Sequence, residues 1–227
     1  MTAYEMHVLF RTLGQQQGLQ QVRGILAESI DSFLYESIIQ TMRLILLGNT
    51  QPSKEVVTPQ YTKIGVISSL GNLLRTEEQN ISLSANETLV NLSLANSPFV
   101  YTNFAIKYKD DKKYACRIIE HDRIYDTLND YLNRASHEYP IVALYNGNTD
   151  KLLELNLFTG DSQQDVVSII TSYIKMPAKV HYGSSTDFVN CDLPEHLHTS
   201  IVEYAVKLWF ESLGLSSQPK QTKDNNQ

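Results

Sequence analysis

The sequence predicts an α+β fold in which terminal helices pack on a mostly antiparallel central β-sheet region. Apolar residues recur at helical spacing near both ends of the chain, whereas the middle carries β-branched and aromatic runs separated by turn residues. Such a sheet leaves an apolar face that helices can cover. We therefore expect a single domain over residues 1–215. The polar residues 216–227 offer little apolar surface, which predicts a flexible tail.

The closing segment, Cys191–Gly214, has the strongest helical pattern. Asp192 is placed to cap its first turn, and Glu195 follows three residues later, as in a capping box. Pro194 suits the first turn, and Gly214 is placed as a left-handed C-cap. The apolar stripe between these ends comprises Leu197, Ile201, Val202, Ala205, Leu208, Trp209, Phe210 and Leu213.

The N-terminal part predicts two further helices. The first covers Ala3–Leu13 and is ended by Gly14, after which residues 15–21 form a polar connection. The second covers Ser29–Leu47 and is ended by Gly48 and Asn49. Its apolar stripe comprises Ile30, Phe33, Leu34, Ile38, Met42 and Ile45.

Less regular segments follow the second helix. We expect a loop over Thr50–Thr62, which contains two prolines, and a short helix over Ile64–Arg75. Partial alternation of apolar and polar residues predicts a strand near Leu89–Leu94.

The middle of the chain predicts two β-hairpins joined by a helix. Phe99–Cys116 forms the first hairpin, with its turn at Asp110 and Asp111. Residues 122–135 then form a helix with one apolar face, made of Ile124, Leu128 and Leu132. Residues 140–146 and 151–158 form the second hairpin around a turn over residues 146–150.

Two segments connect the hairpins to the closing helix. The β-branched density of Asp165–Met176 favours a strand that Pro177 ends, and a helix remains the alternative. Gly183–Asn190 is expected to be a loop.

Composition makes some classes of function less favoured than others. The net charge of −6 disfavours nucleic acid as the main partner, because phosphate contacts require clustered basic residues. The one short basic cluster, Lys107–Lys113, is interrupted by two aspartates and fits a hairpin tip. With only two cysteines, Cys116 and Cys191, a reducing compartment is the default expectation. We find no signal peptide and no apolar run long enough for a membrane span.

Six residues invite a metal hypothesis, which their spacing does not favour. Zinc requires about four converging nitrogen or sulfur ligands, and the chain has no paired cysteines. Two of the histidines are two positions apart on a helix and point in different directions. We therefore expect neither a metal nor another cofactor. The six residues are Cys116, His121, Cys191, Asp192, His196 and His198.

Catalytic motifs give no better match. Asp110 and Asp111 are paired carboxylates, but lysines flank them at a turn and favour solvated ion pairs. His121 and Asp122 fit an acid–base pair, or a helix start capped by the aspartate. We find no nucleophile elbow and no phosphate-binding glycine motif. We therefore expect no enzyme activity; an intracellular enzyme with a site assembled from distant residues stays open as an alternative.

Tyrosine is unusually frequent, with 13 tyrosines against 7 phenylalanines. Two interpretations stay open: core residues with solvated hydroxyls, or subunit contacts, which suit a side chain that is apolar at one end and polar at the other. The tyrosines concerned are Tyr101, Tyr108, Tyr114, Tyr125, Tyr131, Tyr139 and Tyr145.

Four separated stretches resemble ring or adaptor proteins from the neck of tailed bacteriophages, especially crAss-like phages. They are the opening TAYEMHVLFR, the helix IDSFLYESIIQTMR at Ile30–Arg43, YIKMPAKV at Tyr173–Val180, and the closing helix. The second stretch departs from the family pattern at Tyr35, Ser37 and Ile38. The closing helix matches at Leu193, Pro194, Glu195, His198, Ile201, Val202 and Ala205.

The resemblance implies a structural virion protein without a catalytic site. Such proteins form homo-oligomeric rings, commonly about twelvefold, below the portal, and they connect head and tail around the DNA channel. The implied partners are the portal protein and adjacent tail ring proteins, with DNA only passing through and no membrane. The implied location is the neck or tail of the virion, after synthesis in the host bacterial cytoplasm. Another virion part, such as a tail-tube or head-completion protein, is the first alternative.

Overall fold

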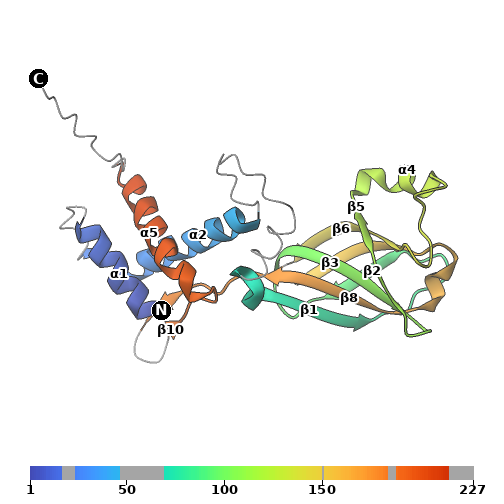
Figure 1. The fold of residues 1–227 in the computed structure, drawn as a ribbon, viewed down its shortest axis with the longest axis horizontal. Helices are drawn as coiled ribbons and strands as arrows, with labels where there is room; N and C mark the ends of the chain where they lie inside the picture. Colours follow the sequence, from blue (N-terminus) through green and yellow to red (C-terminus); the bar gives the residue numbers. More distant parts are fainter. Residues whose placement is uncertain (17–23, 47–68, 150, 184–187, 215–227) are drawn as a thin grey trace, which may run out of the picture. The chain divides into compact units, whose positions relative to one another are not determined.

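The computed structural model describes residues 1–16, 24–46, 69–149, 151–183 and 188–214. The fold is α+β, with helices near both termini and mostly antiparallel sheets between them, as the sequence predicts (Figure 1). The chain forms two compact units, where the sequence offered no boundary. A helical unit combines residues 1–72 with residues 177–227, and a β unit comprises Leu73–Met176.

The helical unit is built from α1 (Ala3–Gln16), α2 (Ala27–Leu46) and α5 (Glu195–Ser212). These three helices pack on one another, and Figure 1 shows them grouped together. A short antiparallel ribbon, β9 (His181–Tyr182) with β10 (Phe188–Val189), contacts α1 and α2. The buried apolar side chains of the helices are Ala3, Met6, Phe10, Ile30, Leu34, Ile38, Ile39, Met42, Ile201, Val202, Ala205, Val206, Trp209 and Phe210.

Two contacts fix how the helices of this unit approach each other. The Ser37 hydroxyl on α2 is fully buried and donates to the Ile201 carbonyl on α5, at 2.6 Å. The rings of Phe10 on α1 and Trp209 on α5 lie 5.8 Å apart. A serine at this point allows close helix packing, because its side chain is small and its hydroxyl has a carbonyl partner.

The helices differ from prediction mainly at their ends. Gly14 does not end α1, because it lies buried inside the helix, which continues to Gln16. Pro194 is the N-cap of α5 rather than a first-turn residue, and no side chain caps the helix. The Asp192 carboxylate instead accepts a hydrogen bond from the Ala178 backbone, at 3.3 Å. Gly214 has a φ of 72°, which confirms the predicted left-handed C-cap.

The β unit contains two four-stranded sheets. The first has the order β1-β8-β3-β4 and the second β2-β7-β6-β5. All pairings are antiparallel except β5 with β6, which is parallel. The strands are β1 (Leu74–Asn80), β2 (Leu89–Ser93), β3 (Pro98–Tyr108), β4 (Lys113–Ala115), β5 (Arg117–Ile119), β6 (Ile141–Thr149), β7 (Leu152–Phe158) and β8 (Val166–Lys175).

The two sheets bury their apolar faces against each other. Their buried cluster combines β3 and β8 side chains of the first sheet with β2, β6 and β7 side chains of the second. We expected the terminal helices to cover these faces; instead, the apolar face of each sheet has the other sheet as its partner. The cluster comprises Val90, Leu92, Phe104, Ile106, Tyr108, Cys116, Val142, Leu153, Leu155, Leu157, Val166 and Ile169.

Both sides of this sandwich are joined between the sheets. On one side, β4 continues into β5 through the buried Cys116, whose backbone N–H donates to Phe104. On the other side, two side chains of β1 bind backbone groups of the second sheet. Gln79 binds Ser93, the last residue of β2, and Glu77 accepts from the backbone N–H of Ala95, two residues further on. These bonds satisfy backbone groups at sheet edges that would otherwise lack a protein partner.

The predictions for the middle of the chain are confirmed in part. The strand near Leu89–Leu94, both hairpins and the strand over Asp165–Met176 are present. The helix expected over Ile64–Arg75 is wrong at its C-terminal end: residues 71–73 form one 3-10 turn, and Leu74 begins β1. Phe188 and Val189 form β10 inside the expected loop. The expected loop over Thr50–Thr62 and the tail over 216–227 lie outside the described residues.

The helix predicted over residues 122–135 is shorter than expected. A 3-10 turn, η3 (His121–Arg123), leads into α4 (Ile124–Asn129), and the chain becomes extended at Asp130. Ile124 is buried, but Leu132 lies beyond the helix and is 87% exposed. The predicted apolar face therefore does not extend over the whole segment.

Candidate functional site

The segment from β5 to the start of β6 forms the surface that we consider most suited to function. It comprises β5, η3, α4 and a loop over residues 130–140, which we call the aromatic loop. Val142 of β6 points into the sandwich core, so its neighbours Ile141 and Ala143 lie on the outer face of the second sheet. Both are nevertheless fully buried, whereas the outward residues of β7 are partly exposed. The segment from β5 to β6 therefore covers the outer face of the second sheet at β6. Figure 1 shows α4 beside β5 and β6.

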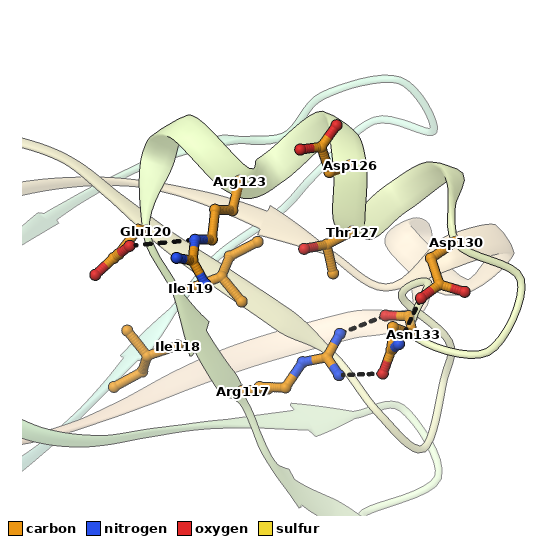
Figure 2. Close-up of a pocket in the computed structure, with 9 residues that line it drawn as sticks. All are labelled: Arg117, Ile118, Ile119, Glu120, Arg123, Asp126, Thr127, Asp130 and Asn133. Carbon is orange, nitrogen blue, oxygen red and sulfur yellow. Dashed lines mark hydrogen bonds and ion pairs between the residues drawn. The ribbon is translucent and has the colours of Figure 1, made fainter.

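A pocket of about 660 Å³ lies between β5 and α4. Figure 2 shows the side chains that line it, with Ile118 and Ile119 of β5 among charged residues. Glu120 and Arg123 form an exposed ion pair at 3.5 Å. An exposed pair of this kind adds little stability, because water screens it and both side chains lose conformational freedom. The pocket is therefore open and mixed in charge.

The first half of the aromatic loop is held by Arg117 of β5 and by polar groups of the loop itself. The Arg117 guanidinium donates to both the backbone and the side-chain oxygen of Asn133, as Figure 2 shows. The Asn133 amide donates to Asp130, and the Leu132 backbone N–H donates to the same carboxylate at 3.0 Å. These hydrogen bonds, the one from Asn133 foremost, lower the pKa of Asp130.

The second half of the loop is fixed against the sandwich. Ser136 and Tyr139 exchange backbone hydrogen bonds at 3.3 and 3.2 Å. The His137 ring stacks on Tyr108 with 3.9 Å between ring centroids, and the Tyr108 hydroxyl donates to the His137 carbonyl at 3.0 Å. Burial raises the pKa of Tyr108 well above its ordinary value, so this hydroxyl stays a donor.

This fixed loop presents apolar side chains to solvent. Tyr131 is 78% exposed, Leu132 87% and Tyr139 71%. The three side chains line a second pocket of about 290 Å³, together with Arg134, whose guanidinium lies 5.1 Å from the Tyr131 ring centroid. Exposed apolar groups on a loop held by hydrogen bonds suit protein contacts, because little conformational entropy remains to be lost on binding.

The structure separates the seven tyrosines named from the sequence into two groups. Tyr101, Tyr108 and Tyr114 are buried or half-buried with the sandwich core, as the first interpretation requires. Tyr125, Tyr131, Tyr139 and Tyr145 are exposed, and all four belong to α4, the aromatic loop or β6. The core interpretation is therefore confirmed for the first group, whereas subunit contact stays a prediction for the four exposed tyrosines.

The residues of the metal hypothesis are not brought together. Cys116 is buried in the β unit, and burial raises the pKa of its thiol to about 12. Cys191 belongs to the helical unit, and burial raises the pKa of its thiol to about 11. The buried His198 donates to the Leu193 carbonyl at 2.8 Å, whereas His196 is exposed. Within the described residues, no group of three or more His, Cys, Asp or Glu side chains is arranged to hold a metal ion.

The two candidate catalytic pairs lie at the β3–β4 turn and in η3. At the β3–β4 turn, Asp111 pairs with Lys107 at 2.7 Å and Asp110 with Lys112 at 3.3 Å. Asp111 has a φ of 61°, which aspartate tolerates in a tight turn. The His121 ring contacts Tyr145, with 5.3 Å between ring centroids.

Sequence reasoning missed one titratable cluster in the helical unit. The Asp31 carboxylate on α2 lies between two histidines: His7 Nε2 of α1 at 2.6 Å and His181 Nδ1 of β9 at 2.8 Å. The Tyr182 backbone N–H also donates to Asp31, at 3.4 Å. Burial lowers the pKa of His7, although Asp31 opposes the shift. The only sign of this cluster in the sequence is that His7 and Asp31 each lie on the apolar face of a predicted helix.

Fold and surface together define an α+β protein with a two-sheet sandwich and a hydrogen-bonded loop that exposes Tyr131, Leu132 and Tyr139. No family model matches the chain, and no curated protein is similar to it in sequence. Among the helices that the structure describes, none has the length and apolar character to cross a membrane.

Proposed function

We propose that this chain is a structural protein of a tailed phage, and that it forms a homo-oligomeric ring below the portal. In that position it connects head and tail around the DNA channel. The observation that carries the assembly part of the proposal is the aromatic loop, which holds Tyr131, Leu132 and Tyr139 exposed and in fixed positions. The phage assignment rests on the resemblance of the four sequence stretches.

The positions of those stretches support the proposal. Three of them fall on α1, α2 and α5, which pack together in one unit. The fourth, Tyr173–Val180, leads from the end of β8 to the residue before β9. A resemblance concentrated in elements that share one core is more informative than scattered matches, because the elements must fit one another.

The net charge of −6 is also compatible with a ring through which DNA passes. A channel that held DNA tightly would slow its passage, and tight non-specific binding depends on clustered basic residues. The acidic balance therefore fits a wall that DNA slides past.

The mass of the purified full-length protein tests the proposal. We expect light scattering to show a discrete ring-sized species, either for the chain alone or after addition of a portal protein from a crAss-like phage. Electron microscopy of the same fraction should show rings with a central opening.

A chain that stays monomeric under all these conditions and does not bind the portal would overturn the proposal. A ring that binds a tail-tube protein but not the portal would move the chain to another place in the virion. Turnover of a small substrate by the monomer would favour the enzyme alternative.

A further inference from the structure

We infer that the aromatic loop of one copy docks on the outer face of β2 and β7 of a second copy. This inference rests on the proposed homo-oligomer and names the two surfaces that meet in it. We call the second surface the leucine face: it consists of Leu89 on β2 with Leu152 and Glu154 on β7.

The leucine face has exposed apolar groups that the fold does not use. Leu153, Leu155 and Leu157 point into the sandwich core, so alternation directs Leu152 and Glu154 outward. Leu152 is 49% exposed and Leu89 43% exposed. Both belong to the adjacent strands β2 and β7, where Asn91 pairs with Glu154. Leu89 is opposite Asn156, so along the strand direction the Glu154 carboxylate lies between Leu152 and Leu89.

The pocket that Tyr131, Leu132 and Tyr139 line is complementary in charge to the leucine face. Arg134, on the aromatic loop, has no carboxylate partner within ion-pair distance among residues 1–16, 24–46, 69–149, 151–183 and 188–214. Over the same residues Glu154 has no cation within that distance. The exposed Glu138 of the same loop is not among the residues that line the pocket of Tyr131, Leu132 and Tyr139, whereas Arg134 is. That pocket and the leucine face therefore each combine exposed apolar groups with a charge of opposite sign, Arg134 on the one and Glu154 on the other. Docking would pair them while covering both apolar groups.

The positions of the surfaces also favour contact between copies. In the second sheet β5 forms one edge and β2 the other, with β6 and β7 between them. Tyr131, Leu132 and Tyr139 line a pocket together with Arg117 of β5, whereas the leucine face begins at β2. Each copy therefore carries two different surfaces of the same sheet, as a head-to-tail contact requires. Such contacts close a ring when the rotation between copies is suitable.

Charge reversal tests the pairing directly. We expect Arg134→Glu and Glu154→Arg each to weaken self-association by about tenfold or more, because like charges then face each other. Mixing the two variants should restore assembly, since each contact then joins either the native pair or the reversed pair. The double variant R134E/E154R should assemble alone. Lys112→Glu, at the β3–β4 turn, is the matched control and should assemble normally.

A second variant tests the apolar anchor without disturbing the core. Leu132→Ser should weaken self-association about tenfold, because Leu132 is 87% exposed in the free chain and should be buried in the contact. Leu44→Ser on α2, where the leucine is 51% exposed, is the control and should have no effect. Thermal unfolding of every variant reports whether it is folded.

The outcomes separate this inference from the proposed function. Restoration by mixing, with loss in L132S, supports the inference. A parent chain that forms rings, with folded R134E and L132S variants that form them equally well, overturns the inference and leaves the proposed function standing. A parent chain that forms no oligomer, alone or with the portal protein, overturns both.

Discussion

The side-chain amide of Gln79 binds both backbone groups of Ser93, and it takes the place that a neighbouring strand would have. Its Oε1 accepts from the Ser93 N–H at 3.1 Å, and its Nε2 donates to the Ser93 carbonyl. An amide side chain can replace a peptide group in this way because it offers the same donor and acceptor. The bond pair joins β1 of one sheet to β2 of the other.

Replacing Gln79 should open this side of the sandwich. For Gln79→Ala we expect the free energy of unfolding to fall by about 1 kcal/mol, since both hydrogen bonds are lost but water can reach the backbone groups. Urea denaturation followed by far-UV circular dichroism measures the change. Gln164→Ala, at an exposed position of η4 (Gly160–Asp165), is the control. Equal stability of the two variants would show that the hydrogen bonds from Gln79 to Ser93 do not help hold the two sheets together.

A larger loss is expected at Gln163, one residue before that control. Gln163 is 4% exposed, donates to the carbonyls of Glu87 and Leu157, and accepts from the backbone and hydroxyl of Thr159. Gln163→Ala leaves these buried groups without a partner, so we expect a loss of about 3 kcal/mol. The same denaturation experiment measures it, and a loss as small as that of Q164A would show that water replaces the amide.

The stability of the helical unit should fall on acidification. Burial keeps the pKa of His7 below its ordinary value of 6.5; Arg11 and His181 act in the same direction, and Asp31 opposes them. The unfolded chain therefore binds a proton on His7 before the folded chain does. Stability is full above about pH 6.5 and decreases as the pH falls below that value.

The single tryptophan, Trp209, is buried in the helical unit and makes this prediction measurable. Its fluorescence should report unfolding at lower denaturant concentration near pH 5 than near pH 7. His7→Gln keeps a donor toward Asp31 but does not titrate, so it should reduce the pH dependence. His196→Gln, at an exposed position of α5, should leave it unchanged. An identical pH dependence in both variants would exclude His7 as its source.

The two thiols should be unreactive in the folded protein. Burial raises the pKa of Cys116 to about 12 and that of Cys191 to about 11, so neither forms appreciable thiolate near neutral pH. An aromatic disulfide reagent at about pH 8 should label no cysteine in the native chain and both after denaturation. Rapid labelling of native Cys191 would show that the helical unit opens locally around it.

Elements with local signals could be predicted from the sequence. The apolar stripe of α2 and the β-branched residues of β8 specify their own conformations. The strand β1 was missed because its sequence, LRTEEQN, is mostly polar. Its inward side chains Glu77 and Gln79 bind the backbone of the opposite sheet rather than fill the core. A search for alternating apolar residues does not detect a strand of this kind.

The surfaces depended on contacts between distant residues, which a single sequence does not display. Asp31 meets His7 across 24 positions and His181 across 150. The tyrosine excess was visible from the start, but its division between core and surface follows from where α4 ends. Because α4 ends at Asn129, Tyr131 and Leu132 belong to the aromatic loop and not to a helix face packed on the sheet.

The helical unit is drawn from both ends of the chain, with the β unit between them. During synthesis, α1 and α2 leave the ribosome before the β unit, whereas α5, which packs on both of them, is made after it. The β unit can therefore complete its fold while α1 and α2 still lack α5. If the chain builds a ring, a copy released before α5 would lack the complete helical unit, so translation itself would limit assembly to finished subunits.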